Sequence, residues 1–346
     1  VDYTRRSSVL LKAGRPVIDV AYYIGENAPA MTGSRDPELP DGYDYDYINS
    51  DVLIHRASMV DGRITVPDGP SYAALVLPKQ TVMRPEVAEA IRKLVADGAK
   101  VLGPRPETSP SLQNYPACDQ KLVDLVNRGW GNLGKGTVNE VDSFEQFLAD
   151  NGVQPDVSVI GGADILCAAA GAGKIGFGKR GGIVFKHRAT PDREIYFLSN
   201  TTHKPLDFTA SLRVTGRKPS LWNANTGTIS DADAFTQKNG RTHVPLHLEP
   251  AESIFVVFGG KIARDVHGSA ASNTPEYKPI ATLDGSWTVR FDGQGAPGEI
   301  VFNTLTDWAK HPDDAIKHYA GTGVYETSFD PVSYTHLRAH ETVVRI

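Results

Sequence analysis

An alternating run of aromatic and acidic residues holds the side chains best suited to chemistry in this chain of 346 residues. It reads GYDYDYINSDVLIHR and extends from Gly42 to Arg56. Three tyrosines alternate in it with two aspartates: Tyr43, Asp44, Tyr45, Asp46 and Tyr47. Flat rings stack on the faces of pyranose sugars, and carboxylates accept hydrogen bonds from sugar hydroxyls. The run therefore predicts a polar, aromatic mouth that binds a sugar.

The same run also has a purely structural interpretation. Ile48, Val52 and Leu53 follow at helical spacing, which is typical of a helix with one buried face. The run would then be the capped start of a helix from Tyr43, and its tyrosines would pack against neighbouring residues. These residues alone leave both interpretations open.

Carboxylates for glycoside hydrolysis must lie on both sides of a sugar-binding cleft, and separate rigid elements usually supply them. Asp44, Asp46 and Glu26 are candidates by composition. Because Asp44 and Asp46 are too close in sequence to flank a sugar, we expect sugar binding or helix capping from them rather than acid/base catalysis. We assign no catalytic residue in this chain.

A second set of aromatic residues lies in the last part of the chain. Trp308 and Tyr319 suit stacking on a carbohydrate and equally suit a hydrophobic core, so both are kept as candidate sugar-binding residues. Trp287, Val289 and Phe291 alternate as one face of a strand should. We therefore expect Trp287 in a core.

A glycine-rich segment imitates nucleotide-binding motifs. Gly171, Gly173 and Gly176 match the pattern G-x-G-x-x-G, but no helix follows that could direct its N-terminus at a pyrophosphate. Residues Gly173 to Lys179 nearly match a P-loop, yet Arg180 replaces the Ser or Thr that would bind magnesium. We expect no nucleotide there.

Cysteine and histidine supply neither a nucleophile nor a metal site in this reading. Cys118 and Cys167 are too few for a disulfide framework or a zinc set made of cysteine. A glutamine-amidotransferase nucleophile needs a tight turn between strand and helix, whereas we expect Cys118 in a loop. His336 and His340 lie four residues apart, but the usual Glu after the first His is missing.

The overall composition narrows the class of partner. Lys and Arg number 36 against 41 Asp and Glu, so the formal net charge is −5. Without a dense basic run, the chain is not expected to bind nucleic acid or a membrane surface. No apolar stretch approaches the roughly 20 residues that span a bilayer. The composition therefore favours a neutral or small partner.

Strands and helices alternate over the first part of the chain. Apolar strands are predicted at Pro16 to Ile24, Tyr72 to Pro78 and Lys100 to Gly103, and an amphipathic helix at Pro85 to Gly98. This order predicts a doubly wound parallel sheet in residues 13–150, of the flavodoxin-like (glutamine-amidotransferase-like) type. The loop with Glu26 and the tyrosine–acid run are expected at the carboxyl end of the first strand, where open sheets bind ligands.

The pattern changes to short strands without helices after residue 150. A Gly/Ala-rich linker is predicted at 151–182, an antiparallel β-sandwich at 183–262, and a second linker at 263–280. A third β region follows at 281–330. The six strands predicted for the sandwich are residues 182–187, 194–199, 206–214, 219–222, 242–248 and 253–258.

Several of these segments together resemble one family of enzymes. They are RPVIDVAYYIGENAP, GYDYDYINSDVLIHR, PSYAALVLPKQTVMRPEVAEAIRKLVADGAKVLGPRP and LTDWAKHPDDAIKHYAGTGVYETSFD. The chain resembles bacterial α-L-rhamnosidases of glycoside hydrolase family 106 over most of residues 5–330. The resemblance implies a catalytic barrel followed by a flavodoxin-like domain, a β-sandwich and a sugar-binding (galactose-binding-like) jelly roll, of which 281–330 would be the incomplete start. The stretch 161–182 departs from what the family leads us to expect.

The resemblance also implies where catalysis takes place. Two glutamates of the barrel would remove terminal α-L-rhamnose with inversion, with calcium assisting sugar binding. No position here matches those glutamates. Residues 1–12 resemble the tail of the barrel's last helix, and 331–346 resemble non-native sequence. We therefore expect a fragment that is inactive alone, was covalently preceded by the barrel, and comes from a periplasmic or secreted parent.

Two other readings stay open. The chain could be a non-catalytic carbohydrate-binding or scaffold module whose third region binds glycans unaided. It could also be the accessory part of a β-galactosidase-like hydrolase, because such enzymes share the flavodoxin-like domain.

Overall fold

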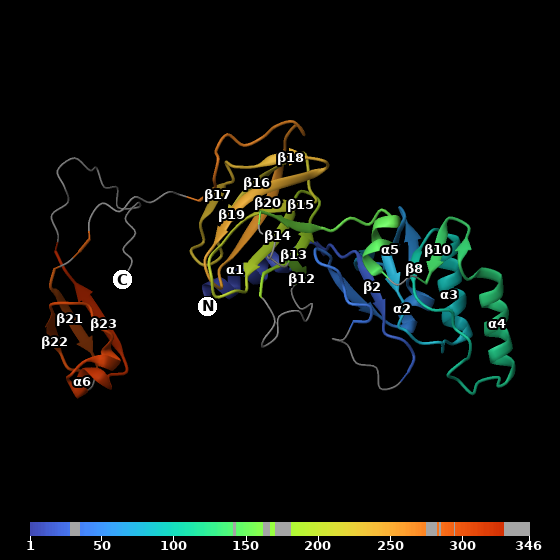
Figure 1. Ribbon diagram of the computed structural model, residues 1–346, viewed down its shortest axis with the longest axis horizontal. Helices are drawn as coiled ribbons and strands as arrows, with labels where there is room; N and C mark the ends of the chain where they lie inside the picture. The colour runs from blue at the N-terminus through green and yellow to red at the C-terminus, as the bar shows by residue number, and fades with distance from the viewer. Residues whose placement is uncertain are drawn as a thin grey trace. The chain divides into compact units, whose positions relative to one another are not determined.

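The computed structural model describes residues 1–27, 35–140, 143–161, 167–169, 181–274, 282–283, 285–293 and 295–328. The chain divides into two compact units, Val1–Pro275 and Glu276–Ile346, which we describe separately. It is multidomain and mostly β, with several sheets and few helices (Figure 1). Within the described ranges, no helix is long and apolar enough to cross a membrane. Three of the segments considered above lie outside the described residues. They are the glycine-rich motif with Gly171, Gly173 and Gly176, the pair His336 and His340, and the tail 331–346.

A six-stranded sheet forms the centre of the α/β part of the first unit. Its strands, in spatial order, are β3 (Tyr45–Ile48), β2 (Val20–Tyr23), β7 (Ala74–Val76), β8 (Lys100–Leu102), β10 (Gly136–Asn139) and β9 (Asn132–Leu133). The first five run parallel, and β9 is antiparallel to β10. Numbered along the chain, the parallel strands lie in the order 2-1-3-4-5.

Helices cover the two faces of this sheet. They are α2 (Ser50–His55), α3 (Pro85–Ala96), α4 (Ala117–Gly129) and α5 (Phe144–Asp150). One core joins Ala21 and Tyr23 of β2 to α2, α3 and α4, and the other joins Val20 and Tyr22 to Phe144 and Phe147 of α5. Successive residues of β2 thus point to opposite faces, as the strand period requires.

The sequence explains why α3 forms where it was predicted. Pro85 occupies the first helical position, where a missing N–H costs nothing. Val87, Ile91, Leu94 and Val95 recur at helical spacing, and all four are buried against the sheet. The predicted helix and the predicted strands at β7 and β8 are confirmed.

A small antiparallel sheet lies between α2 and β7. Its strands are β4 (Ser58–Val60), β5 (Arg63–Thr65) and β6 (Ser71–Tyr72). The turn between β4 and β5 is Asp61–Gly62, and both residues have positive φ, 49° and 75°. Two such residues make the hairpin turn that matches strand twist, which explains the DG sequence.

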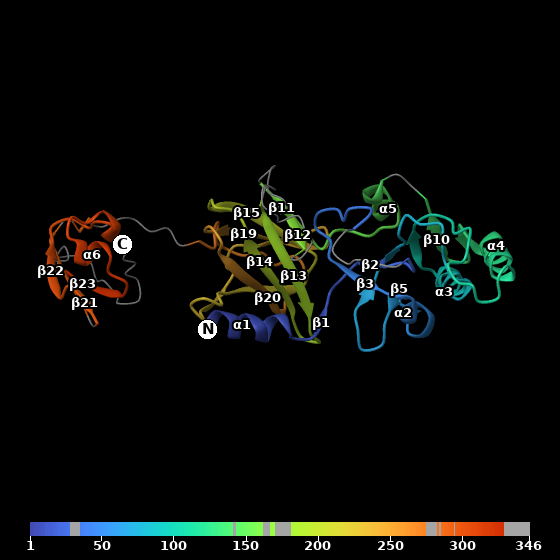
Figure 2. The same cartoon turned by 90° about the horizontal axis from the view of Figure 1, so that it is seen from below.

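Two mainly antiparallel sheets pack face to face in the rest of the first unit (Figure 2). The larger comprises β1 (Arg15–Pro16), β13 (Ile183–Ala189), β14 (Glu194–Asn200), β20 (Ser253–Lys261), β16 (Arg217–Trp222) and β17 (Ile229–Asp231), with β12 (Cys167–Ala169) beside β13. The smaller comprises β11 (Val157–Ile160), β15 (Leu206–Leu212), β19 (Arg241–Leu248) and β18 (Thr236–Lys238). Phe185 and Tyr196 of one sheet meet Phe208 and Val244 of the other in a shared core.

The six predicted sandwich strands are confirmed, with additions. The segment predicted as a linker, 151–182, supplies β11 and β12, so part of it belongs to the two sheets. The predicted strand Pro16 to Ile24 also divides, because Arg15 and Pro16 pair with β13 while Val20 to Tyr23 enter the parallel sheet. Local apolar pattern shows that a segment is extended but does not show which sheet it joins.

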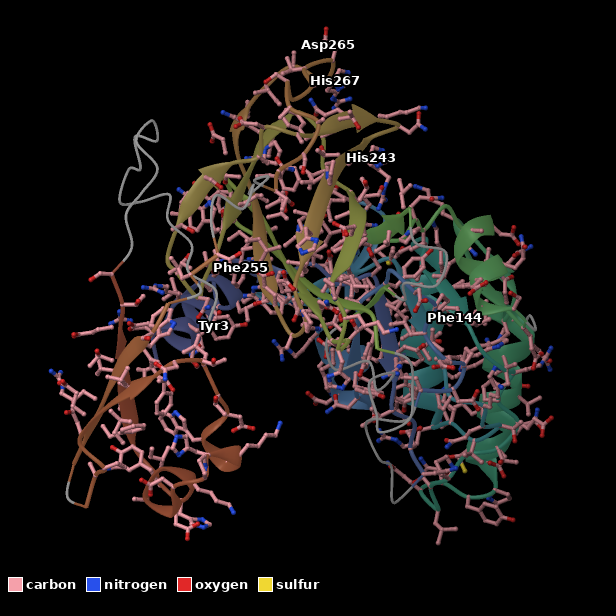
Figure 3. All side chains as sticks on the ribbon, turned by 60° about the vertical axis from the view of Figure 1, so that its left-hand side comes forward. Tyr3, Phe144, His243, Phe255, Asp265 and His267 are labelled. Carbon is pink, nitrogen blue, oxygen red and sulfur yellow. The ribbon has the colours of Figure 1, made fainter. Side chains whose placement is uncertain are left out.

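Helix α1 (Asp2–Leu11) packs on the outer face of the larger sheet. Leu10 and Leu11 contact the cluster that contains Phe255, and the Tyr3 hydroxyl lies 2.8 Å from Ser253 Oγ. Figure 3 shows Tyr3 near Phe255 where the helix meets the sheet. This helix is the segment compared above with the last helix of a barrel, and that assignment stays a prediction.

The second unit contains β21 (Trp287–Asp292), β22 (Glu299–Phe302) and β23 (Thr322–Glu326) in one antiparallel sheet. A 3-10 helix, η1 (Trp308–Lys310), and α6 (Asp314–Lys317) pack on it. Trp287, Val289 and Phe291 are buried on one face, which confirms the predicted core position of Trp287.

The packing of α3 leads to a stability prediction. Ile91 is fully buried between the helix and the sheet. We expect Ile91→Ala to lower the free energy of unfolding of the first unit by about 2–5 kcal/mol, because the cavity cannot collapse fully. Lys93→Ala, on the exposed side of the same helix, should change it by less than about 0.5 kcal/mol. Urea denaturation followed by circular dichroism checks both values, and equal effects would contradict this packing.

Candidate functional site

The tyrosine–acid run folds as a strand and then a short helix. Its alternating part is β3, and α2 begins only at Ser50. Asn49 caps that helix, because its side chain accepts a hydrogen bond from the Val52 amide at 3.0 Å. The expectation of a helix from Tyr43 is therefore wrong. The spacing of two in the tyrosines was the strand period, and it prevailed over the helical spacing that follows.

The start of the run also lies at the other end of the sheet from the predicted one. Because β3 runs parallel to β2 with Tyr45 opposite Val20, Tyr43 and Asp44 lie at the amino end of both strands. Glu26 follows β2 and so lies beyond its carboxyl end. The structure does not bring Glu26 together with Tyr43 and Asp44, which corrects the prediction of a common site at the carboxyl end.

Tyr43 and Asp44 are both buried, and their polar atoms are bonded within the protein. The Tyr43 hydroxyl donates to the Val153 carbonyl at 2.8 Å. Asp44 is 2 % exposed, and its carboxylate accepts two hydrogen bonds from Lys186 Nζ, at 2.7 and 2.9 Å. Burial raises the pKa of Asp44, and Lys186 opposes that shift. These contacts join the α/β part to the sandwich rather than opening a sugar-binding mouth.

The remaining residues of the run divide between the two faces of the sheet. Tyr45 and Tyr47 pack edge-on at 5.4 Å between ring centroids, and Arg35 lies 4.6 Å from the centre of the Tyr45 ring. Asp46 faces the opposite side, where the Tyr72 hydroxyl donates to it at 3.1 Å. A strand separates adjacent side chains in this way, so Tyr45 and Asp46 do not form one mouth. Their sugar-binding roles stay predictions.

Glu26 anchors the start of α3. Its side chain is 6 % exposed and accepts hydrogen bonds from the Arg84 backbone amide at 2.6 Å and from Arg84 Nε. A carboxylate at a helix N-terminus is stabilised by the helix dipole and satisfies an orphan N–H. This contact accounts for Glu26 in structural terms.

Trp308 and Tyr319 pack in the core of the second unit. Their ring centroids lie 5.1 and 5.0 Å from that of Phe291. The Trp308 indole donates to the Tyr325 hydroxyl at 2.6 Å, and the Tyr319 hydroxyl donates to the Asp292 carbonyl at 2.5 Å. The two rings are only half-buried, so their predicted role in stacking on sugar remains a prediction beside this packing role.

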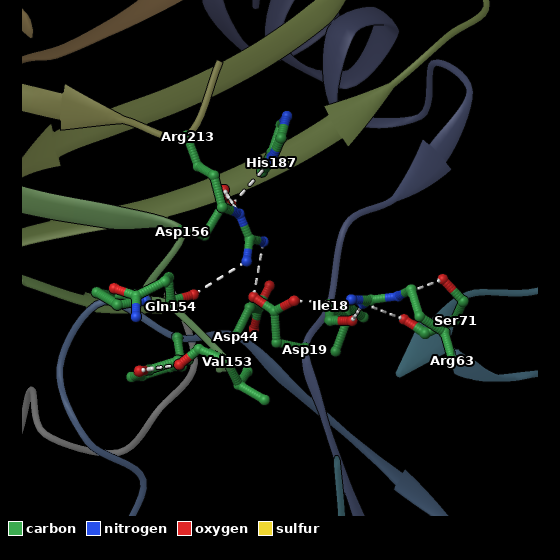
Figure 4. A network of polar contacts seen from close by, with 12 residues as sticks. Ile18, Asp19, Asp44, Arg63, Ser71, Val153, Gln154, Asp156, His187 and Arg213 are labelled. Carbon is green, nitrogen blue, oxygen red and sulfur yellow. Dashed lines mark hydrogen bonds and ion pairs between the residues drawn. The ribbon is translucent and has the colours of Figure 1, made fainter. Parts of the chain in front are cut away.

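Buried charges meet where the α/β part contacts the sandwich (Figure 4). We call this set the joint network; its members are Asp19, Asp44, Arg63, Asp156, Lys186, His187, Glu194 and Arg213. Each carboxylate in it has at least one cationic partner. The acids Asp19, Asp44 and Asp156 are all at most 2 % exposed. Buried carboxylates need such partners, because desolvation without one is costly.

Arg213 is one of the residues that link the two parts. Its Nη2 donates to Asp19 Oδ2 at 2.8 Å, its Nη1 donates to the Gln154 carbonyl at 2.9 Å, and its Nε lies 3.4 Å from Asp156 Oδ1. Arg63 holds the other oxygen of Asp19 at 3.2 Å. Burial alone would lower the pKa of Arg213, but Asp19 and Asp156 raise it overall, so the guanidinium stays charged.

His187 lies between two carboxylates. Its Nδ1 is 2.8 Å from Asp156 Oδ2 and its Nε2 is 3.0 Å from Glu194 Oε2. The ring stacks on Tyr196 with 3.8 Å between centroids, and the Tyr196 hydroxyl donates to Asp156 at 2.9 Å. Burial alone would lower the pKa of His187, but the two acids raise it above its ordinary value of 6.5. Both ring nitrogens can therefore donate, as imidazolium requires.

The chemistry open to this network is positioning rather than hydrolysis. A general acid or nucleophilic carboxylate must face a cleft that holds the substrate, whereas these acids are buried and paired with Arg, Lys or His. Calcium needs several oxygen ligands around one point. Across the described ranges, no group of three His, Cys, Asp or Glu could hold a metal ion. The calcium that the family implies was expected in the barrel, and it stays a prediction.

Sequence reasoning missed this network almost entirely. Of its members, only Asp44 was a candidate. A separate prediction, that Cys118 lies in a loop, is wrong, because Cys118 is a buried residue of α4. One signal was available. Asp19 and His187 stand within apolar segments, PVIDVAYYI and IVFKH, and a charge inside a buried strand needs a partner. The identity of that partner could not be read, because Arg213 is 194 residues from Asp19.

Comparison with known proteins identifies the family. The family model of α-L-rhamnosidases, glycoside hydrolase family 106, matches residues 1–237. The chain belongs to this family. The family 106 chain also superposes on the structure of a rhamnosidase from Novosphingobium sp. PP1Y with a TM-score of 0.81 and 32 % identity, covering 94 % of this chain and 30 % of that one.

Other relatives of the family 106 chain carry different names. A Formosa agariphila protein provisionally named a β-glucuronidase is 35 % identical over 288 residues, which are 82 % of this chain and 23 % of that protein. A β-galactosidase from Bacillus circulans sp. alkalophilus matches at 10 % identity over 72 % of this chain and 42 % of that one, with a TM-score of 0.40. The last likeness is too weak to carry an argument. The chain spans less than a third of the rhamnosidase and of the Formosa protein.

Removing Arg213 should destabilise the first unit. We expect Arg213→Ala to lower its free energy of unfolding by about 3 kcal/mol or more, because Asp156 and Asp19 each lose a partner while buried. Arg5→Ala is the matched control, since Arg5 forms an exposed pair with Asp2 and its loss should have little effect. Thermal or urea unfolding measures both. An Arg213 variant as stable as the Arg5 variant would contradict the role of the network.

The charge on His187 should make stability depend on pH. Its folded pKa is raised, so its stabilising contribution is complete below 6.5 and is lost as the pH rises through the folded pKa. We expect the stability difference between wild type and His187→Gln to shrink over that range. Unfolding free energies across pH measure it, and exposed His318→Gln is the control. A difference that stays constant or grows with pH would show that His187 is not held as a cation.

Proposed function

We propose that this chain is the accessory, non-catalytic part of an α-L-rhamnosidase that removes terminal α-L-rhamnose from plant or microbial glycans. Hydrolysis takes place in a catalytic barrel that precedes these residues in a longer protein, and any calcium that assists sugar binding is held there. The chain supplies domains that support that barrel. By itself it is inactive.

The carrying observation is the likeness to the Novosphingobium rhamnosidase, which covers 94 % of this chain but 30 % of that structure. The chemistry of the described residues supports the same conclusion. Their buried carboxylates belong to the joint network or cap helix α3, so none of those discussed above is poised as a paired acid and base across a cleft.

We also propose finer names for two of the domains. The parallel strand order 2-1-3-4-5 supports a flavodoxin-like type for the α/β part. The three-stranded sheet of the second unit, with its aromatic core, is consistent with the start of a jelly roll. In the parent protein such a domain would contact glycan beside the barrel.

A second candidate activity is hydrolysis of β-glucuronides. The observation that favours it is the name of the Formosa agariphila relative, which is 35 % identical to this chain. The residues described here would have the same structural role in the accessory part of a rhamnosidase and in that of a glucuronidase. The catalytic barrel, rather than this chain, decides between the two sugars.

An activity assay tests the proposal. The purified chain should release no aryl alcohol from an aryl α-L-rhamnoside or an aryl β-D-glucuronide, because catalytic carboxylates are supplied elsewhere. The full-length parent should cleave the rhamnoside. Turnover of the rhamnoside by the chain alone would overturn its accessory role, and a parent that cleaves only the glucuronide would overturn the substrate.

A further inference from the structure

A cavity of about 320 Å³ with a mixed polar and apolar lining lies between the starts of α3 and α4. Both helices follow strands of the parallel sheet, so the cavity is at the carboxyl end of β7 and β8. Open α/β sheets bind ligands at this end. Its volume is at the lower end of the range for small-molecule sites, enough for one or two sugar rings.

Beside the less polar Pro85, Ala117 and Cys118, the cavity is lined by uncharged hydrogen-bonding side chains. They are Ser109, Ser111, Gln113 and Asn114, joined by one acid, Glu86, and one base, Lys121. In the described part of the chain, no internal hydrogen bond or ion pair engages the side chains of Gln113, Asn114, Glu86 or Lys121. A lining of amides and hydroxyls with balanced charge suits a neutral, hydroxyl-rich ligand.

The loop that supplies these residues is held in one conformation by its own polar groups. The backbone N–H of Ser109 donates to Asp119 Oδ1 at 2.7 Å, and the backbone N–H of Gln113 donates to Ser111 Oγ at 3.1 Å. The Cys118 thiol, which is buried, lies 3.6 Å from the Ser111 carbonyl. A site whose backbone is already ordered loses less entropy when it binds.

Two large apolar side chains on the same loop face solvent. Leu112 is 85 % exposed and Tyr115 is 65 % exposed, and the Tyr115 amide closes a turn onto the Leu112 carbonyl at 3.2 Å. Their neighbours Gln113 and Asn114 line the cavity. Tyr115 itself does not line the cavity but lies on the loop that does. An aromatic ring on such a loop can stack on a pyranose while polar groups of the cavity bond the sugar hydroxyls.

We propose that this cavity and Tyr115 form an accessory subsite for a neutral sugar of a glycan chain. The inference rests on the proposed function only in taking glycans as the ligand class. It can fail while the rhamnosidase assignment holds, since binding is measured on this chain and hydrolysis on the parent.

Ligand-detected NMR on the whole 346-residue chain tests the subsite. The probes are methyl α-L-rhamnopyranoside and a neutral rhamnose-containing disaccharide, with methyl β-D-glucuronide and inorganic phosphate as charged comparisons. We expect saturable binding of the neutral probes with Kd on the order of 1–10 mM, and weaker or no binding of the charged ones.

Variants locate the binding. Tyr115→Ala should weaken it about three- to tenfold through loss of stacking, and Gln113→Ala should weaken it about two- to tenfold through loss of a hydrogen bond. Ile229→Ala is the matched control, because Ile229 is 63 % exposed on β17 and should leave binding unchanged. No saturable binding below about 50 mM, unchanged binding in both loop variants, or preference for glucuronide or phosphate would each overturn the proposal.

Discussion

The ion pair that Arg213 forms with Asp19 and Asp156 is the contact on which the rest of the first unit depends. Asp19 precedes β2 of the parallel sheet, and Asp156 precedes β11 of the sandwich. A buried carboxylate without a cation is far less stable than one in water. Separation of the two parts would break the pair between Arg213 and Asp19 and leave Asp19 with Arg63 alone. Lys186 repeats the arrangement with Asp44. This explains why residues 1–275, with two different kinds of sheet, form one compact unit.

The same constraint limits what this unit can do chemically. An acid that is held by Arg, Lys or protonated His at short distance is a poor base at neutral pH and has no access to a substrate. The buried acids among the described residues therefore stabilise the structure. Polar groups that are not used in this way gather instead at the carboxyl end of the parallel sheet, in the loop before α4, where a ligand could reach them.

Local patterns in the sequence predicted most of the secondary structure. Pro85 and the buried face of α3, and the alternation of Trp287, Val289 and Phe291, gave correct predictions because each depends on neighbours within a few residues. The prediction of a helix from Tyr43 was wrong because a strand period and a helical period overlap at Ile48. The tyrosines follow the strand period. The predicted place of Tyr43 and Asp44 in the sheet was also wrong, since strand direction and pairing depend on distant segments.

By itself, the sequence determined the family, the type of most elements and the multidomain organisation. Family motifs and hydrophobic periods are carried by short stretches of chain, so they can be read without a structure. Only the tertiary structure decided that Asp44 meets Lys186, that Arg213 meets Asp19, and that His187 lies between Asp156 and Glu194. The first two pairs are 142 and 194 residues apart. Charge pairing over such separations is set by how sheets pack, and the order of residues along the chain does not contain it in any local pattern.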